Sequence, residues 1–263
     1  MNQTGNEVLN LKSNFLRKGE TLDDLQLKGL HLIQKKDAFR FGVDAVLLAN
    51  FANIKKNASV IDLCSGSGIV PFILAGKTPA GKIIGIEIQK EMVDMANRSV
   101  KLNNLQGKVE IFHGDLRDLE YLKTMPESDV VTVNPPYKLR NSGIINSKNE
   151  NAIARHEICC DLEDVVKAAK VLLKDNGKIY MIHRPDRFAD IMCTMRKYKI
   201  EPKFIRMVCP SIYKAPNMVL IEGQNNGGRF LKWGASLYIH EPDGSYTDEI
   251  DRIYGRSEER YGV

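Results

Sequence analysis

The chain has 263 residues, enough for one α/β domain with a sizeable core and short additions. Hydrophobic residues make up 43% and charged residues 27%, as in an ordinary globular protein, and no apolar run approaches the roughly 18 residues of a membrane span. The polar N-terminal segment, residues 1–14, lacks the apolar centre of a signal peptide, so we expect a cytoplasmic protein. The net charge of +5 is compatible with a polyanionic partner without establishing one.

The five cysteines form no C-x-x-C pair. This pattern predicts reduced thiols and indicates neither a zinc site nor a disulfide framework. We therefore expect no metal, and we expect a monomer.

Three regions are expected along the chain. Residues 1–56 form an N-terminal extension packed on the core, residues 57–240 form the main domain and residues 241–263 form a C-terminal tail. Within the extension, Leu27–Gln34 predicts a short strand and Val43–Ala52 an apolar helix. Asp44 lies in the first turn of that helix, where the helix dipole stabilises a carboxylate.

From Ala58 onward, short apolar runs alternate with amphipathic segments. This alternation predicts an α/β fold in which a mostly parallel seven-stranded sheet carries helices on both faces. A short linker joins the last two strands, so we expect them to form a C-terminal antiparallel hairpin, with one antiparallel strand at the end of the sheet. A further extended segment is expected within Leu231–Ile239. The predicted strands are Ser59–Leu63, Lys82–Ile88, Val109–Phe112, Asp129–Val133, Gly177–His183, Lys203–Val208 and Met218–Glu222. The predicted helices centre on Ile69–Gly76, Lys90–Asn103, Leu116–Leu122, Leu162–Leu173 and Arg187–Lys197.

The turn after the first predicted strand indicates a cofactor site. It contains Gly66 and Gly68, which let the backbone turn tightly and let a ligand approach. Glu87 ends the next strand, where a carboxylate can accept hydrogen bonds from two ribose hydroxyls. A G-x-G followed by an acidic residue at the end of the next strand is a stronger signal than G-x-G alone.

The same spacing also occurs in dinucleotide-binding dehydrogenases, but two residues argue against that class. The third position of the glycine fingerprint is Pro71 instead of Gly or Ala. Asp62 precedes the glycines, where its charge would repel a pyrophosphate and attract the ammonium group of a methionine moiety. The site therefore favours a methyl donor over a nicotinamide.

Asp115 and Leu116 follow the third predicted strand. In this place Asp115 can accept a hydrogen bond from an adenine amine while Leu116 packs against the ring. Taken alone, Asp115 is equally explained as the cap of the following helix. Its position after Asp62 and Glu87 favours the binding role, and one Asp can serve both.

The fourth predicted strand ends in Asn134-Pro135-Pro136-Tyr137. The carboxyl ends of the first and fourth strands flank the crevice where open α/β sheets bind ligands. A conjugated amine is a poor nucleophile, and two hydrogen-bond acceptors, the Asn134 side-chain carbonyl and the Pro135 backbone carbonyl, can hold it in line and stabilise its developing charge. Tyr137 offers a flat face for a planar substrate. The tetrapeptide therefore predicts methylation of a planar amino nitrogen.

With these motifs in place, the chain resembles the class I amino-methyltransferases of the N-P-P-Y type and, more narrowly, the bacterial tRNA(Val) adenine-N6 methyltransferase family. The resemblance covers nearly the whole chain. The N-P-P-Y motif itself is shared by adenine and glutamine methyltransferases, so it indicates chemistry, whereas the F-R-F-x-x-D and A-R-H-E stretches are more specific. The segments that carry the resemblance are Phe39–Ala49, Asp62–Gly68, Gly85–Gln89, Asn134–Tyr137, Ile153–Glu157, Gly177–Pro185 and Tyr246–Gly255.

The resemblance implies a Rossmann-like class I methyltransferase fold, S-adenosyl-L-methionine as cofactor and tRNA as substrate, with the adenine just 3′ of the anticodon as target. It also implies that Asp44 lies near the methionine end of the cofactor. Ser65 stands where family members often have Thr or Gly, a conservative difference. The expected catalytic residues are Asn134, Pro135 and Tyr137. The expected cofactor-binding residues are Asp44, Asp62, Cys64, Ser65, Gly66, Gly68, Glu87, Ile88, Asp115, Leu116 and Asn134.

The polar segment Lys138–Glu157 follows the catalytic tetrapeptide and is expected to act as a lid or RNA clamp, since long loops beside active sites are commonly functional. The residues expected to contact the substrate are Tyr137 and, within this segment, Lys138, Arg140, Arg155 and His156. We expect His156 to be structural or to contact the substrate and not to act as a general base, because N-methylation does not require one.

Three alternatives stay open. A glutamine N-methyltransferase acting on release factors shares the target chemistry, but that family carries a helical N-terminal domain, whereas residues 1–57 here include a strand-like run. A guanine-N2 methyltransferase of ribosomal RNA is also compatible. A catalytically silent RNA-binding protein is disfavoured by the intact Asn134–Tyr137 motif and Glu87.

Overall fold

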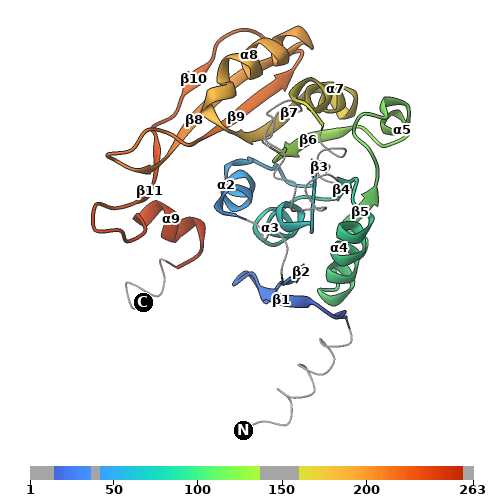
Figure 1. Cartoon of the computed structure of the whole chain (residues 1–263). Helices are drawn as coiled ribbons and strands as arrows, with labels where there is room; N and C mark the ends of the chain where they lie inside the picture. Colours follow the sequence, from blue (N-terminus) through green and yellow to red (C-terminus); the bar gives the residue numbers. More distant parts are fainter. Residues whose placement is uncertain (1–14, 37–41, 137–159, 257–263) are drawn as a thin grey trace, which may run out of the picture.

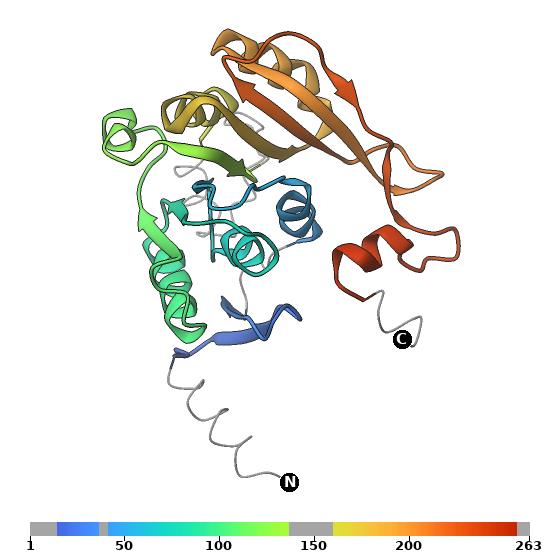
Figure 2. The same ribbon diagram turned by 180° about the vertical axis from the view of Figure 1, so that it is seen from behind.

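The computed structural model describes residues 15–36, 42–136 and 160–256 (Figure 1). Within these ranges, nine strands form one large sheet and two more form a separate hairpin. Helices lie on both faces of the large sheet, which confirms the predicted α/β architecture (Figure 2). None of the helices in these ranges has the length and apolar character that a bilayer crossing requires.

Five adjacent parallel strands form one part of the sheet, from the edge strand β5 inward, in the order β5-β4-β3-β6-β7. The chain runs outward from β3 through β4 to β5, and then returns to the other side of β3 as β6. This reversal is the topological switch point at which open α/β sheets bind ligands. The strands are β3 (Val60–Leu63), β4 (Ile83–Glu87), β5 (Val109–His113), β6 (Ser128–Val133) and β7 (Leu173–His183).

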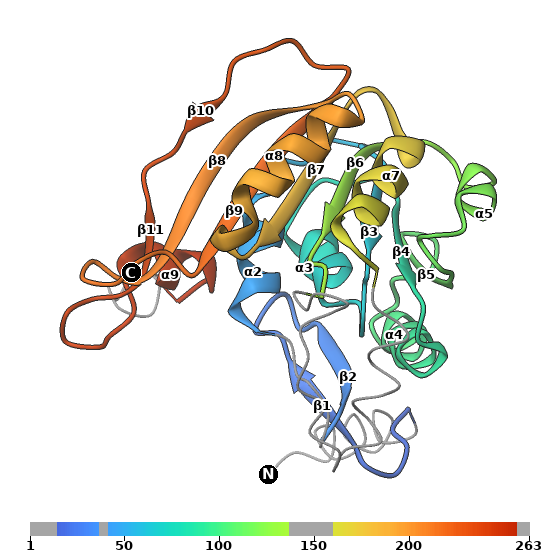
Figure 3. The same cartoon turned by 45° about the horizontal axis from the view of Figure 1, so that its top comes forward.

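Beyond β7 the sheet contains the predicted hairpin of β8 (Ile200–Ser211) and β9 (Met218–Asn225). The expectation that an antiparallel strand ends the sheet is wrong, because β9 lies between β7 and β8 and is antiparallel to both. The helix before β8 carries the chain two positions beyond β7, and the hairpin brings β9 back into the position between them. Two short strands, β10 (Lys232–Trp233) and β11 (Leu237–His240), then pair in parallel with β8 (Figure 3).

Alternation along the strands divides the core into two clusters, one on each face of the sheet. Val60 belongs to the first cluster, whereas the next residue, Ile61, belongs to the second, as the two-residue period of a strand requires. The first cluster includes side chains from α2 (Val43–Phe51), α3 (Ile69–Lys77), α4 (Lys90–Leu102) and α9 (Asp248–Ile253). The second includes side chains from α5 (Leu119–Lys123), α7 (Leu162–Leu172) and α8 (Phe188–Lys197), the last preceded by the 3-10 turn η1 (Pro185–Arg187).

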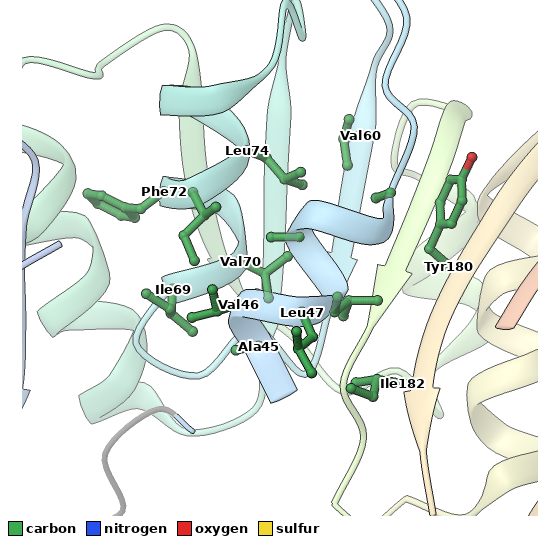
Figure 4. Close-up of a cluster of buried hydrophobic side chains, with 14 of the residues drawn as sticks. Ala45, Val46, Leu47, Val60, Ile69, Val70, Phe72, Leu74, Tyr180 and Ile182 are labelled. Atoms are coloured by element: carbon green, nitrogen blue, oxygen red, sulfur yellow. The ribbon is translucent and has the colours of Figure 1, made fainter. Parts of the chain in front are cut away.

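Helix α2 is enclosed by the first cluster, although it precedes the main domain in the sequence. Its five central residues, from Ala45 to Ala49, are all buried. Figure 4 shows Val46 beside Ile69 of α3 and Leu47 on the side of Ile182 of β7. Because apolar contacts surround it, this helix has a fixed position relative to the carboxyl ends of the strands.

The N-terminal hairpin, β1 (Glu20–Asp24) and β2 (His31–Lys35), packs against α4. Ser99 Oγ accepts a hydrogen bond of 2.9 Å from the Ile33 backbone N–H. Arg98 donates two hydrogen bonds, of 2.6 and 2.7 Å, to the Glu20 carboxylate, and the exposed fractions of the two side chains are 15% and 7%. The predicted strand therefore exists, but it begins later than Leu27 because the chain is still turning there.

We expect Arg98→Ala to lower the free energy of unfolding by about 2–3 kcal/mol, because the Glu20 carboxylate loses its two hydrogen bonds from Arg98 while it keeps the one from the Arg17 backbone N–H. Urea unfolding would measure the loss. Arg17→Ala is the control: it breaks an ion pair with Asp94 whose side chains are 65% and 38% exposed, and it should cost less than about 1 kcal/mol.

The pH dependence of the loss in Arg98→Ala provides a second test. The Arg98 hydrogen bond lowers the pKa of Glu20 below its ordinary value of 4.5. The stabilisation is therefore present above pH 4.5 and is lost as the pH falls through the lowered pKa. An equal cost of Arg98→Ala at pH 7 and at pH 3 would contradict this account.

Candidate active site

The turn between β3 and α3 has an unusual backbone. Cys64, Gly66 and Gly68 have φ angles of 56°, 56° and 89°, in the left-handed region that favours glycine. A Cβ atom on Gly66 would meet nothing within 4 Å, so open space adjoins the backbone there. A Cβ on Gly68, the N-cap of α3, would lie 3.3 Å from the Phe72 ring, so this position is close-packed. The turn thus combines a close-packed base with a backbone that a ligand can approach.

Glu87 connects this turn to the end of β4. Its Oε2 accepts a hydrogen bond of 2.8 Å from the Gly66 backbone N–H, and its Oε1 accepts one of 2.8 Å from the Gln89 backbone N–H. The side chain is buried. Ile88, the next residue, is half-buried, and its carbonyl oxygen lies 3.0 Å from His113 Nε2. The predicted pairing of a glycine turn with a carboxylate at the end of the next strand is therefore present in the geometry.

Asp62 lies beneath the turn and is only 1% exposed. The Thr132 hydroxyl donates a hydrogen bond of 2.6 Å to Asp62 Oδ1. Burial raises the pKa of Asp62 to about 7; the Thr132 hydrogen bond opposes the shift and the Glu87 charge adds to it. A buried carboxyl group of this kind is suited to a cationic partner, whose charge would favour the ionised form.

Two residues that support Asp62 were not among the predicted site residues. Asp62 in β3 is paired with Gly85 on one side and with Thr132 on the other. A Cβ on Gly85 would lie 2.6 Å from Ser65 Oγ, so only glycine leaves room for the buried Ser65 side chain. The sequence carries one signal for Thr132, because it is the only hydroxyl within the apolar run Val130–Val133.

Asn134 follows β6 directly and is half-buried, with Pro135 buried beside it. Asn134 Nδ2 donates a hydrogen bond of 3.0 Å to Asp44 Oδ2. Asp44 Oδ1 accepts a second hydrogen bond, of 3.0 Å, from the Ala45 backbone N–H in the first turn of α2. The structure thus brings together Asp44 and Asn134, which are 90 residues apart in sequence.

Asp115 is not the cap of the following helix. Asp118 caps α5 by accepting a hydrogen bond of 3.0 Å from the Tyr121 N–H, so α5 begins at Leu119 and not at Leu116 as expected. The Asp115 carboxylate accepts hydrogen bonds of 2.5 and 2.9 Å from Arg117. Leu116 is buried in the core cluster on the α5 face. The adenine-binding roles of Asp115 and Leu116 stay predictions.

The thiol of Cys64 lies 3.8 Å from that of Cys160, just before α7. The hydrogen-bonding contact with Cys160 and burial raise the pKa of the Cys64 thiol, so the turn carries no thiolate charge at neutral pH.

Tyr137, Lys138, Arg140, Arg155 and His156 lie outside the described residues, and their roles stay predictions. His183, at the end of β7, is within the described residues and is buried. Its Nδ1 accepts a hydrogen bond of 2.8 Å from the Arg184 N–H, and burial lowers its pKa, so the ring is neutral at pH 7.

Comparison with known proteins now places the chain in a class. The family model described as a methyltransferase domain matches residues 54–237, so the chain belongs to that family. A predicted O-methyltransferase from Agrobacterium tumefaciens has a solved structure similar to this one, with a TM-score of 0.66, 21% identity, and coverage of 81% of this chain and 96% of that one. A tRNA m1G37 methyltransferase from M. jannaschii aligns with a TM-score of 0.54 at 16% identity, over 81% of this chain and 59% of that one. These neighbours confirm the class I methyltransferase fold.

Relatives found by sequence indicate a more specific group of methyltransferases. The chain is 26% identical over 239 residues to a protein from Porphyromonas gingivalis named tRNA1(Val) (adenine(37)-N6)-methyltransferase, covering 88% of this chain and 93% of that protein. A protein of the same name from Aeromonas hydrophila is 24% identical over 86% of this chain and 93% of its own length. The resemblance seen in the motifs is therefore confirmed over most of the chain.

We expect the contribution of Asp62 to the free energy of unfolding to fall as the pH rises from about 4 to about 7, because its pKa is raised from 3.8 to about 7 on folding. The folded state then holds a proton that the unfolded state has lost, with a slope of at most about 1.4 kcal/mol per pH unit. Asp62→Asn keeps an acceptor for Thr132, removes the charge and should flatten this part of the curve, measured by urea unfolding across pH.

Asp129 provides a control, because folding lowers its pKa whereas it raises that of Asp62. Burial raises its pKa, but hydrogen bonds from Lys174 and Ser59 outweigh burial and hold the pKa at about 2. Its contribution is therefore present above pH 3.8 and lost as the pH falls toward 2. Identical pH profiles for the Asp62→Asn and unaltered proteins would show that Asp62 is not perturbed by burial.

Proposed function

We propose that this protein transfers a methyl group from S-adenosyl-L-methionine to the N6 amine of an adenine in tRNA, the adenine 3′ of the anticodon in tRNA(Val). The observation that carries the proposal is the Asn134 amide at the carboxyl end of β6, adjacent to the glycine turn and carboxylates at the ends of β3 and β4. The names of the curated relatives support the choice of base and RNA.

The residues at the turn fit the cofactor. An ionised carboxylate has about four lone-pair sites. Glu87 accepts two backbone hydrogen bonds of 2.8 Å and a longer one of 3.3 Å from Gln89 Nε2, so displacement of the Gln89 side chain by the ligand would leave capacity for two ribose hydroxyls. Asp62, with its pKa near 7, suits the methionine ammonium and does not suit a pyrophosphate. The open space beside Gly66 lets the ligand reach the backbone.

The bound cofactor supplies an electrophilic methyl group on its sulfonium. The Asn134 side-chain carbonyl and the Pro135 backbone carbonyl each accept one hydrogen of the target amine, which turns the nitrogen lone pair toward the methyl group and stabilises the positive charge that forms. Tyr137 stacks on the base, and Lys138, Arg140, Arg155 and His156 contact the RNA around it.

The described N-terminal region also supports RNA over a release factor as substrate. Residues 20–35 form a β-hairpin packed on α4, whereas the glutamine methyltransferases carry a helical domain before the sheet. The short helix α2 then leads directly into the site through Asp44.

Labelled S-adenosyl-L-methionine incubated with unmodified total tRNA should yield N6-methyladenosine, identified by mass after nuclease digestion. Asn134→Ala should leave cofactor affinity nearly intact and lower the rate about 100-fold or more, the usual effect of removing one hydrogen-bonding group from a transition state. Methylation of a release-factor peptide without methylation of tRNA would assign the glutamine class, and N2-methylguanosine in ribosomal RNA would assign the guanine class.

Glu87→Ala should weaken S-adenosyl-L-methionine binding by about 1.5–3 kcal/mol for each charged hydrogen bond lost, measured by calorimetry. Glu110→Ala is the matched control, because Glu110 lies on the neighbouring strand β5 and forms an exposed ion pair with Lys82. Unchanged affinity in Glu87→Ala would remove Glu87 from the cofactor site.

A further inference from the structure

The hydrogen bond between Asp44 and Asn134 can form in only one orientation of the Asn134 amide. A side-chain amide has a donor end and an acceptor end, whereas an ionised carboxylate only accepts. With the Nδ2 end 3.0 Å from Asp44 Oδ2, the amide has one favourable orientation, since a flipped amide would place two oxygen atoms together. Asp44 therefore fixes Asn134 Oδ1 at the opposite end of the amide.

Asp44 is itself held in place. The Ala45 N–H donates to its other oxygen, and the first turn of a helix stabilises a carboxylate through the helix dipole. The five residues that follow Asp44 are buried, so the first turn of α2 has little freedom to move relative to the sheet.

Gly42, the N-cap of α2, leaves the space that this carboxylate occupies. A Cβ on Gly42 would lie 2.6 Å from Asp44 Oδ1, well inside contact distance. The φ of −92° at Gly42 is accessible to any residue, so a side chain here would act by shifting the Asp44 carboxylate and not by straining the backbone.

We propose that Asp44 is a positioning residue for methyl transfer: it orients the Asn134 amide so that Oδ1 accepts a hydrogen of the target amine, and Gly42 preserves the space this requires. The inference rests on the proposed N-methyltransferase function. It differs from the expectation that Asp44 serves the cofactor, because a cofactor ligand acts on affinity whereas a positioning residue acts on kcat.

The test measures kcat, the KM for tRNA and the calorimetric Kd for S-adenosyl-L-methionine in the full chain. Asp44→Ala should lower kcat about 10- to 100-fold, the scale of a misplaced reacting group, and leave the Kd within about 2-fold. Asp44→Asn keeps an oxygen acceptor for Nδ2 and should recover part of the loss. Gly42→Ala keeps the charge, displaces the carboxylate and should also lower kcat, which tests position separately from charge.

Two further measurements separate positioning from a merely structural effect. In an Asn134→Ala background, Asp44→Ala should have almost no additional effect on kcat, because the group it orients is gone. The side-chain amide signals of Asn134 in a ¹H–¹⁵N NMR spectrum, assigned by their loss in Asn134→Ala, should shift in Asp44→Ala and Gly42→Ala. Glu120→Ala, which removes a carboxylate from the first turn of α5 where it pairs with Lys123, is the matched control and should change none of these quantities.

The outcomes are distinguishable. An unaltered chain that transfers no methyl group to tRNA would refute the proposed function and the inference with it. An active chain in which Asp44→Ala weakens cofactor binding at unchanged kcat would refute the inference alone and make Asp44 a cofactor ligand. Additive losses in the double variant, or unshifted Asn134 amide signals, would also overturn it.

Discussion

The pairing of β3 with β6 is the constraint on which the rest of the site depends. These strands are parallel neighbours, with Leu63 opposite Val133, so the turn that follows β3 and the tetrapeptide that follows β6 emerge side by side at one edge. The strands β4 and β5 lie on the β3 side of this pair, and β7 lies on the β6 side. The chain reversal between β3 and β6 is the kind of place where open α/β sheets bind ligands, and the residues proposed for cofactor binding and methyl transfer follow these two strands.

Placing a carboxyl group at this junction has an energetic cost. Asp62 is buried between Gly85 and Thr132, and burial raises its pKa to about 7, so ionising it in the ligand-free protein opposes folding. The Thr132 hydroxyl offsets part of that cost. A cationic ligand would offset more, because it interacts only with the ionised form. Binding of a positively charged ligand beside Asp62 would therefore also raise the stability of the folded protein.

Motif spacing predicted the class of fold and the residues of the turn, because glycine turns and strand-ending carboxylates have local signatures. The supporting residues were harder to predict, since Thr132 and Gly85 matter only through strand register, which places them on either side of Asp62. The start of α5 was misplaced because Asp115 and Asp118 are both good caps, and only the observed bonds distinguish them. The place of β9 depended on how far α8 carries the chain across the sheet, a distance that no local pattern encodes.

The hydrogen bond between Asp44 and Asn134 connects helix α2 to the end of β6. Asp44 reaches Asn134 only because α2 is buried against α3 and β7, a packing that involves residues from three separate parts of the chain. The apolar burial that stabilises α2 therefore also fixes the direction of one polar bond. If Asn134 orients the target amine as proposed, a substitution that loosens α2, even one far from Asn134, would change the orientation of that amide and so couple stability to catalytic geometry.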